Sequence, residues 1–275
     1  MDRETKGLKV GLFTKDSGTI YRPFIHRHYA QLKQENIHIE WVVLDRYQDK
    51  KDHFFKHALR VAKRQAKYNG FPWFLQIVNI LFYKAMVRSK QHPANQHPLP
   101  EEIVTVEVGN LNDDVCVETT KQLPCDVICL MGTRIISKKV LDALKPALVI
   151  NIHSGDPAFV RGSPALFWEI LDGRDTIVLT IHEVVPELDA GPILLQKELP
   201  IRYSGSLGKT LDATSDLLPD QITDMFKEVL RQCQNKTEER RPFSPGKIRV
   251  IPSVLQTIAA HRVCQKKTAS GQKSV

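Results

Sequence analysis

An asparagine and a histidine, two residues apart, stand where an apolar segment gives way to a loop that contains glycine, proline and arginine. They are Asn151 and His153, in the stretch ALVINIHSGDPAFVRGSPALFWEI at residues 147–170. Alternate residues of a strand point to the same side, so the two side chains can share a face. An asparagine amide can donate a hydrogen bond to a developing oxyanion, and a histidine can accept or donate a proton near neutral pH.

A carboxylate further along the chain extends this set. Asp189 lies in VVPELDAGPIL at residues 184–194, and it could hold the imidazole or a water molecule beside it. The three groups together suit acyl transfer to a nitrogen. They include no obvious serine or cysteine nucleophile, so direct attack by a substrate amine is the simpler mechanism. Each residue alone is a weak indication, because asparagine at a strand end is more often a turn former and a lone histidine is more often structural.

The segments that must position these residues alternate between strand-like and helix-like stretches. Strands are expected at 8–18, 37–45, 103–113, 125–136 and 147–155, and then in DTIVLTIHEVV and GPILLQKELPI. This alternation predicts an α/β, Rossmann-like fold with a mostly parallel twisted sheet and helices on both faces. Ligands of such sheets bind beyond the carboxyl ends of the strands, which is where Asn151 and His153 are expected.

Residues 52–91 interrupt the alternation with two expected helices. The first, KHALRVAKRQAK, is strongly basic, and the second, FLQIVNILFYKAMV, is apolar nearly all round. Such a pair could lie on a membrane interface. The interpretation favoured here is a helical insertion that packs its apolar half on the core.

Composition narrows the class of protein. The 275 residues carry a formal net charge of +8, which could suit an anionic partner or a membrane surface, or could sit in the basic helix and the tail. The five cysteines form no CxxC pair and no metal-site spacing. The amino-terminal residues lack the apolar core of a secretory signal, and no run reaches the ~18–20 apolar residues of a membrane span. We therefore expect a cytoplasmic protein with reduced thiols and no metal site.

Residues 151–201 strongly resemble the catalytic half of the formyltransferases that use 10-formyltetrahydrofolate. This family includes the methionyl-tRNA, glycinamide ribonucleotide and sugar-amine formyltransferases. The resemblance depends on Asn-x-His at a strand end, on the loop 157–162 that ends in Arg-Gly, and on Asp-x-Gly at 189–191. It extends over roughly residues 8–45 and 103–205, and three spaced elements in the right order make it specific.

The resemblance implies a role for each part of the site. Asn151 would stabilise the oxyanion formed when the amine attacks the formyl carbon, His153 would manage the proton of that tetrahedral centre, and Asp189 would orient the imidazole. The folate would lie against Met131, Arg134, Ile135, Ile136, Val184, Val185, Pro186, Glu187 and Leu188. The acceptor would be bound by Lys15, Asp16, Ser17, Gly18, Arg161 and Gly162. Arg161 has an alternative role in fixing its loop, and His182 is interpreted as a buried, hydrogen-bonded residue.

The resemblance leaves the acceptor open. It favours formyl transfer from 10-formyltetrahydrofolate to a primary amine of a small molecule, with a nucleotide-linked amino sugar as the candidate class. A tRNA acceptor is disfavoured, because methionyl-tRNA enzymes carry a carboxy-terminal barrel and only 70 residues follow residue 205. Hydrolysis of 10-formyltetrahydrofolate and a non-catalytic folate-binding module are the alternatives, and peripheral membrane contact through 52–91 is disfavoured.

The chain is expected to consist of three parts. Residues 1–205 are expected to form the catalytic domain, with the helical insertion at 52–91. Residues 206–262 are expected to form a carboxy-terminal helical extension. The polar, basic residues 263–275 are expected to be a disordered tail.

Overall fold

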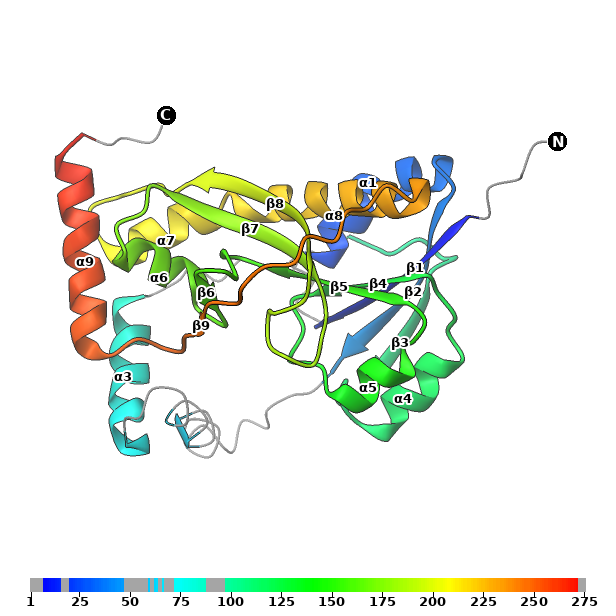
Figure 1. The fold of residues 1–275 in the computed structure, drawn as a ribbon, viewed down its shortest axis with the longest axis horizontal. Coiled ribbons are helices and arrows are strands. Elements are labelled where there is room, and N and C mark those ends of the chain that lie inside the picture. Colours follow the sequence, from blue (N-terminus) through cyan, green and yellow to red (C-terminus); the bar gives the residue numbers. More distant parts are fainter. Residues whose placement is uncertain are drawn as a thin grey trace.

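A seven-stranded sheet, with strand order β3-β2-β1-β4-β5-β7-β8, runs through the molecule (Figure 1). The computed structural model describes residues 7–15, 20–46, 59, 62–63, 66, 72–87 and 97–271. The parallel strands are β1 (Leu8–Lys15), β2 (Ile37–Asp45), β3 (Val104–Val108), β4 (Val127–Met131) and β5 (Leu148–His153). Strands β7 (Thr176–Glu183) and β8 (Ile193–Pro200) run antiparallel to their neighbours. The predicted mostly parallel sheet is confirmed.

Helices cover both faces of the sheet, as the alternation predicted. In Figure 1, α1 (Tyr21–Gln34) and α8 (Leu218–Asn235) lie above the sheet, and α4 (Asp114–Lys121) and α5 (Lys138–Ala143) lie below it. The core has two halves accordingly. Val10 and Leu12 of β1 pack with Phe24 and Phe226 in one half, whereas Phe13 packs with Trp41 in the other. The period-2 alternation of buried strand residues thus sends apolar side chains to both faces.

Glycine at position 11 allows β1 and β2 to pair beside a large ring. A Cβ at Gly11 would lie 2.1 Å from the Trp41 indole of β2. The register between β1 and β2 shifts between Val10 and Gly11. Any larger side chain at position 11 would therefore displace the fully buried Trp41 ring.

The carboxy-terminal helices belong to the same core as the sheet. Leu207 of α7 (Leu207–Ser215), Phe226 of α8 and Cys264 of α9 (Val254–Ala269) are all fully buried in the larger half of the core. Helix α9 packs against α6 (Ala165–Leu171) and α7. A disordered tail from residue 263 is wrong for 263–269, because these residues continue α9. Apolar packing at Cys264 and a Ser253–Gln256 capping box stabilise that helix.

The insertion is confirmed in part. Residues 73–86 form α3 (Trp73–Met86) as expected, whereas the basic helix falls almost entirely outside the described residues. The expectation that α3 packs its apolar half on the core is confirmed only in part, since Ile80 is buried and Tyr83 packs on the core against Phe167. Its buried residues are Gln76, Asn79 and Ile80, and most of its large apolar side chains are exposed. An all-round apolar helix carries no sequence signal for which side faces inward.

Two further features concern membranes and metals. Within the described ranges, no helix combines the length and the apolar character needed to cross a membrane. In that same part of the chain, no three His, Cys, Asp or Glu side chains gather in an arrangement that could hold a metal ion. All five cysteines are free thiols.

Candidate active site

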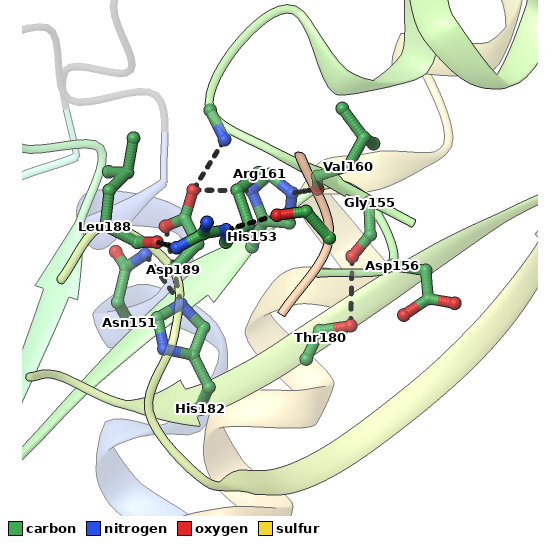
Figure 2. A network of polar contacts seen from close by, with 12 residues as sticks. Asn151, His153, Gly155, Asp156, Val160, Arg161, Thr180, His182, Leu188 and Asp189 are labelled. Atoms are coloured by element: carbon green, nitrogen blue, oxygen red, sulfur yellow. Dashed lines mark hydrogen bonds and ion pairs between the residues drawn. The ribbon is translucent and has the colours of Figure 1, made fainter. Parts of the chain in front are cut away.

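Strand β5 ends with Asn151 and His153, and β7 brings His182 beside them (Figure 2). In the antiparallel register between β5 and β7, Asn151 lies opposite His182. The His153 side chain is 8% exposed and that of His182 is 3% exposed. The predicted location of Asn151 and His153, at the carboxyl end of a parallel strand, is confirmed.

The hydrogen bonds of His153 determine which nitrogen can accept a proton. Its Nε2 lies 2.9 Å from the carbonyl oxygen of Val160, which can only accept, so Nε2 carries the hydrogen. Nδ1 then presents its lone pair, and it lies 3.5 Å from Oδ2 of Asp189. Burial lowers the pKa of His153 and outweighs the opposite effect of the Asp189 charge. The imidazole is therefore neutral at pH 7 and able to act as a base.

His182 has the same arrangement with its nitrogens exchanged. Nδ1 donates to the carbonyl oxygen of Glu183 at 2.8 Å, so Nε2 presents the lone pair. Nε2 lies 3.4 Å from Nδ2 of Asn151 and 3.6 Å from Oδ1 of Asp189. The sequence interpretation of a buried, hydrogen-bonded histidine is confirmed, but it missed this contact with the other two side chains.

The Asp189 carboxylate contacts both histidines. It is 9% exposed, and Oδ2 also accepts the backbone N–H of Gly162 at 2.8 Å. Burial by itself would raise the pKa of Asp189. The contact with His182, the positive charge that His153 carries when it is protonated, and the Gly162 N–H together outweigh burial, so the pKa lies below its ordinary value. Asp189 is an anion at neutral pH.

Unusual backbone conformations bring the two loops together at this carboxylate. Asp189 has φ +47°, in the left-handed region that aspartate tolerates better than most residues. Gly162 has φ +85°, and a Cβ there would lie 2.8 Å from the carbonyl oxygen of Arg249. Glycine at 162 thus permits the conformation in which its N–H points at Asp189.

Arg161 ties the same loops through backbone oxygens. Its Nε donates to the carbonyl oxygen of Gly246 at 2.7 Å, and Nη1 donates to that of Leu188 at 3.3 Å (Figure 2). These bonds hold the loop after β5 against the residue that precedes Asp189. This geometry matches the loop-fixing alternative for Arg161.

Where His153, His182 and Asp189 meet, hydrogen-bond acceptors outnumber donors. His153 and His182 each donate one N–H to a backbone carbonyl and turn a lone pair toward the Asp189 carboxylate. The nearby donors are the Asn151 amide and the Gly162 N–H. A group that brings N–H donors, such as an amine, complements this arrangement, and a proton released there has a base to receive it.

Comparison with known proteins identifies the fold and the family. The family model described as "Formyl transferase" matches residues 23–223. The chain belongs to the formyl transferase family. Methionyl-tRNA formyltransferase of Mycoplasma pneumoniae is 26% identical over 126 residues, which is 46% of this chain and 40% of that protein. The corresponding protein of Lysinibacillus sphaericus is 30% identical over 42% of this chain and 36% of its own length. The chain thus matches less than half the length of these two relatives.

Solved structures share the formyl transferase fold. Glycinamide ribonucleotide transformylase 1 from Symbiobacterium toebii superposes with a TM-score of 0.56 at 17% identity, over 90% of this chain and 96% of that one. A sugar N-formyltransferase from a Shewanella species gives a TM-score of 0.56 at 14% identity, over 93% and 87%. At these identities the likeness establishes the fold alone.

The residues expected to contact folate differ in exposure. Met131 and Ile136 are 1% and 6% exposed and pack in the core, so their side chains do not line a binding surface. Arg134 donates from Nε to the buried Asp45 carboxylate at 2.5 Å. Ile135 is 57% exposed. In the second loop Pro186 and Glu187 are exposed, and the remaining three, Val184, Val185 and Leu188, are half-buried.

The expected acceptor residues divide in a similar way. Lys15 is exposed at the last position of β1, at the same edge of the sheet as the site. Arg161 and Gly162 lie in the loop that contacts Asp189. Asp16, Ser17 and Gly18 fall outside the described residues.

A buried glutamate beneath the β5 loop has a raised pKa. The Glu169 side chain is fully buried on α6, with Oε1 3.4 Å from the Asp156 N–H and Oε2 3.2 Å from Nε of Arg174. Burial raises the pKa of Glu169 from 4.5 to about 6, although Arg174 opposes the shift. Its contribution to stability is therefore largest below pH 4.5 and is lost as the pH rises through 6.

Glu169→Gln is expected to remove that dependence. Between pH 4.5 and 7 the wild-type free energy of unfolding should fall by about 2 kcal/mol relative to the variant, since each pKa unit is worth ~1.4 kcal/mol. Urea unfolding at both pH values measures the difference, and the exposed Glu187→Gln is the matched control. Identical pH profiles for wild type and Glu169→Gln would refute the assignment.

Proposed function

We propose that this protein transfers a formyl group from 10-formyltetrahydrofolate to a primary amine of a small molecule, with a nucleotide-linked amino sugar as the favoured acceptor class. The observation that carries this proposal is the approach of His153, His182 and Asp189 to one another beside the Asn151 amide. Family membership and the names of the relatives agree with the formyl transfer.

The residues have complementary roles in this proposal. Transfer forms a bond between the acceptor nitrogen and the formyl carbon, breaks the bond from that carbon to the folate nitrogen, and moves one proton from the acceptor to the leaving nitrogen. The neutral His153 accepts the proton from the attacking amine at Nδ1, and Asp189 stabilises the imidazolium that results. Asn151 donates from Nδ2 to the oxygen on which negative charge develops.

The exposed residues beside the site fit a flat heteroaromatic ring. Ile135, which follows β4, has an exposed apolar side chain. Val184, Val185 and Leu188 are half-buried on the loop that leads to Asp189. Apolar side chains with convergent backbone groups are typical of small-molecule sites. We propose that these four side chains contact the pterin, with Met131 and Ile136 supporting them from the core. The acceptor is proposed to be bound by Lys15, Asp16, Ser17, Gly18 and Gly162.

An assay of tetrahydrofolate release separates this function from its alternatives. The full chain is incubated with 10-formyltetrahydrofolate alone, with nucleotide-linked amino sugars, with glycinamide ribonucleotide and with methionyl-tRNA. Release that depends on an amino sugar, together with a formylated product detected by mass spectrometry, is the expected result. Release without any amine would replace the proposal with hydrolysis, and release only with methionyl-tRNA would replace the acceptor class. Tight folate binding without release would indicate a non-catalytic binding module.

A further inference from the structure

Helix α3 turns large apolar side chains outward and buries polar ones. Gln76 and Asn79 are 0% and 8% exposed. The exposed fractions of five apolar side chains lie between 42% and 55%, and these are Trp73, Phe74, Leu75, Val78 and Leu81. A surface helix in contact with water normally shows the opposite distribution. Contiguous exposed apolar side chains mark a surface that contacts something other than water. We call these five residues the α3 apolar face.

Contacts on the inner side hold α3 in this orientation. Oδ1 of Asn79 accepts the backbone N–H of Val254 at 3.1 Å, at the first residue of α9. The Tyr83 ring packs edge-on against Phe167 of α6, with ring centroids 5.6 Å apart. Figure 1 shows α3 beside α9 at one end of the molecule, away from α4 and α5. If α3 rotated its apolar face toward the core, the hydrogen bond between Asn79 and Val254 would break and the apolar side chains could not replace it.

The net charge of the chain comes from the sequence segment that contains α3. Residues 53–100 include eight Lys and Arg residues and no Asp or Glu. Since the whole chain has 39 basic and 31 acidic residues, removing these eight leaves 31 of each sign. Lys63, the described basic residue that precedes α3, is exposed. An exposed apolar face therefore occurs within a segment that carries the entire positive excess.

We propose that the α3 apolar face binds the surface of an anionic lipid bilayer. Helices with exposed Trp, Phe and Leu next to Lys and Arg lie in the plane of the interface. The apolar side chains enter the boundary of the acyl chains, and the cations stay near the anionic headgroups. With 14 residues, α3 is too short to cross a bilayer and long enough to lie on one.

The charge distribution favours a bilayer over a second copy of the chain. A two-fold dimer through α3 would place the same surface of both subunits together. The exposed Lys84 of α3 would then approach its copy in the other subunit, and the sequence segment 53–100 contains no Asp or Glu to offset this charge. An anionic bilayer instead supplies the opposite charge and an apolar medium together.

Trp73 provides a reporter for this binding. The chain has three tryptophans, and Trp41 and Trp168 are 2% and 5% exposed, whereas Trp73 is 45% exposed. The full chain is titrated with vesicles of phosphatidylcholine that contain about one-third phosphatidylglycerol, and with vesicles of phosphatidylcholine alone. We expect a shift of tryptophan emission to shorter wavelength and cosedimentation with the anionic vesicles. The partition coefficient obtained from either measurement should fall by about tenfold or more when the salt concentration is raised from ~0.1 M to ~1 M.

Substitutions distinguish the α3 apolar face from the rest of the surface. Phe74→Ser combined with Val78→Ser should lower the partition coefficient by about tenfold or more, because binding scales with the apolar area buried. Val115→Ser is the matched control, since Val115 is 67% exposed on α4. Equal thermal midpoints of the two variants establish that the double variant is folded.

The outcomes separate the possible occupants. Binding to anionic vesicles that the double variant loses and the control retains supports the proposal. No vesicle binding, or binding that the double variant does not weaken, overturns it. A concentration-dependent dimer in analytical ultracentrifugation that the double variant abolishes would overturn it in favour of a second copy. An RNA or protein that binds this face in place of vesicles would also overturn it. None of these results depends on formyl transfer.

Discussion

His153→Ala is expected to lower kcat for amine formylation by about 10²–10⁴-fold, the range that a positioned proton-transfer group contributes. The reason lies in the hydrogen bonds of the ring. Nε2 is committed to the Val160 carbonyl oxygen, so Nδ1 is the nitrogen that can receive the proton of the amine. Alanine leaves no base at this place. Initial rates under saturating donor and acceptor, with the product measured by mass spectrometry, give kcat directly.

Two further variants separate loss of the base from loss of the fold. Alanine at 153 leaves the Val160 carbonyl oxygen without its donor, which costs stability. His153→Gln retains an N–H donor on a side chain of similar reach and is no base, so it should be as inactive as alanine. His38→Ala is the control, because His38 lies near the start of β2, at the opposite edge of the sheet. A His153→Gln enzyme with near wild-type kcat would contradict the assigned role.

The sequence was informative wherever a local pattern determines the structure. The alternation of apolar strands with helix-length spacers predicted the sheet, and the position of Asn151 and His153 after a buried run predicted a site at a strand end. Both are confirmed, because strand periodicity and the burial of parallel strands are properties of short segments. Asp189 was correctly grouped with them, first as a carboxylate further along the chain that could hold the imidazole and then through the resemblance.

The sequence was less informative wherever long-range pairing determines the structure. His182 faces Asp189 because the antiparallel register places it opposite Asn151, and no pattern within β7 encodes that register. Its spacing of seven residues from Asp189, on a strand followed by a loop, was the available signal. The outward face of α3 was missed for a related reason. A helix that is apolar nearly all round does not indicate which side is inside, and here Asn79 decides it through a bond to α9.

The extent of α9 shows how tertiary packing overrides composition. Residues 263–269 are polar and basic, so composition predicted disorder. Cys264 is nevertheless fully buried, and Lys267 pairs with Asp175 at 2.7 Å. One buried side chain per turn is enough to continue a helix against α6 and α7.

Asp189→Asn is expected to lower kcat on the order of 10³-fold and to move the pH dependence in a defined direction. The anionic carboxylate raises the pKa of His153 against the effect of burial. Without that anion the pKa of His153 falls further, so the acid limb of the pH–rate profile should move to lower pH. The rate itself falls because the imidazolium formed during transfer loses its counter-ion.

The asparagine variant is suited to this test because it changes charge and preserves geometry. Asparagine tolerates the left-handed conformation of residue 189, and its side-chain oxygen can still accept the Gly162 N–H. Asp114→Asn is the matched control, since Asp114 is exposed on α4, where its carboxylate pairs with Lys139. The pH–rate profiles of kcat for wild type and both variants measure the shift. An acid limb that stays in place, or moves to higher pH, would show that Asp189 does not act through His153, and the coupled carboxylate and imidazole would have to be abandoned as the proton-handling unit.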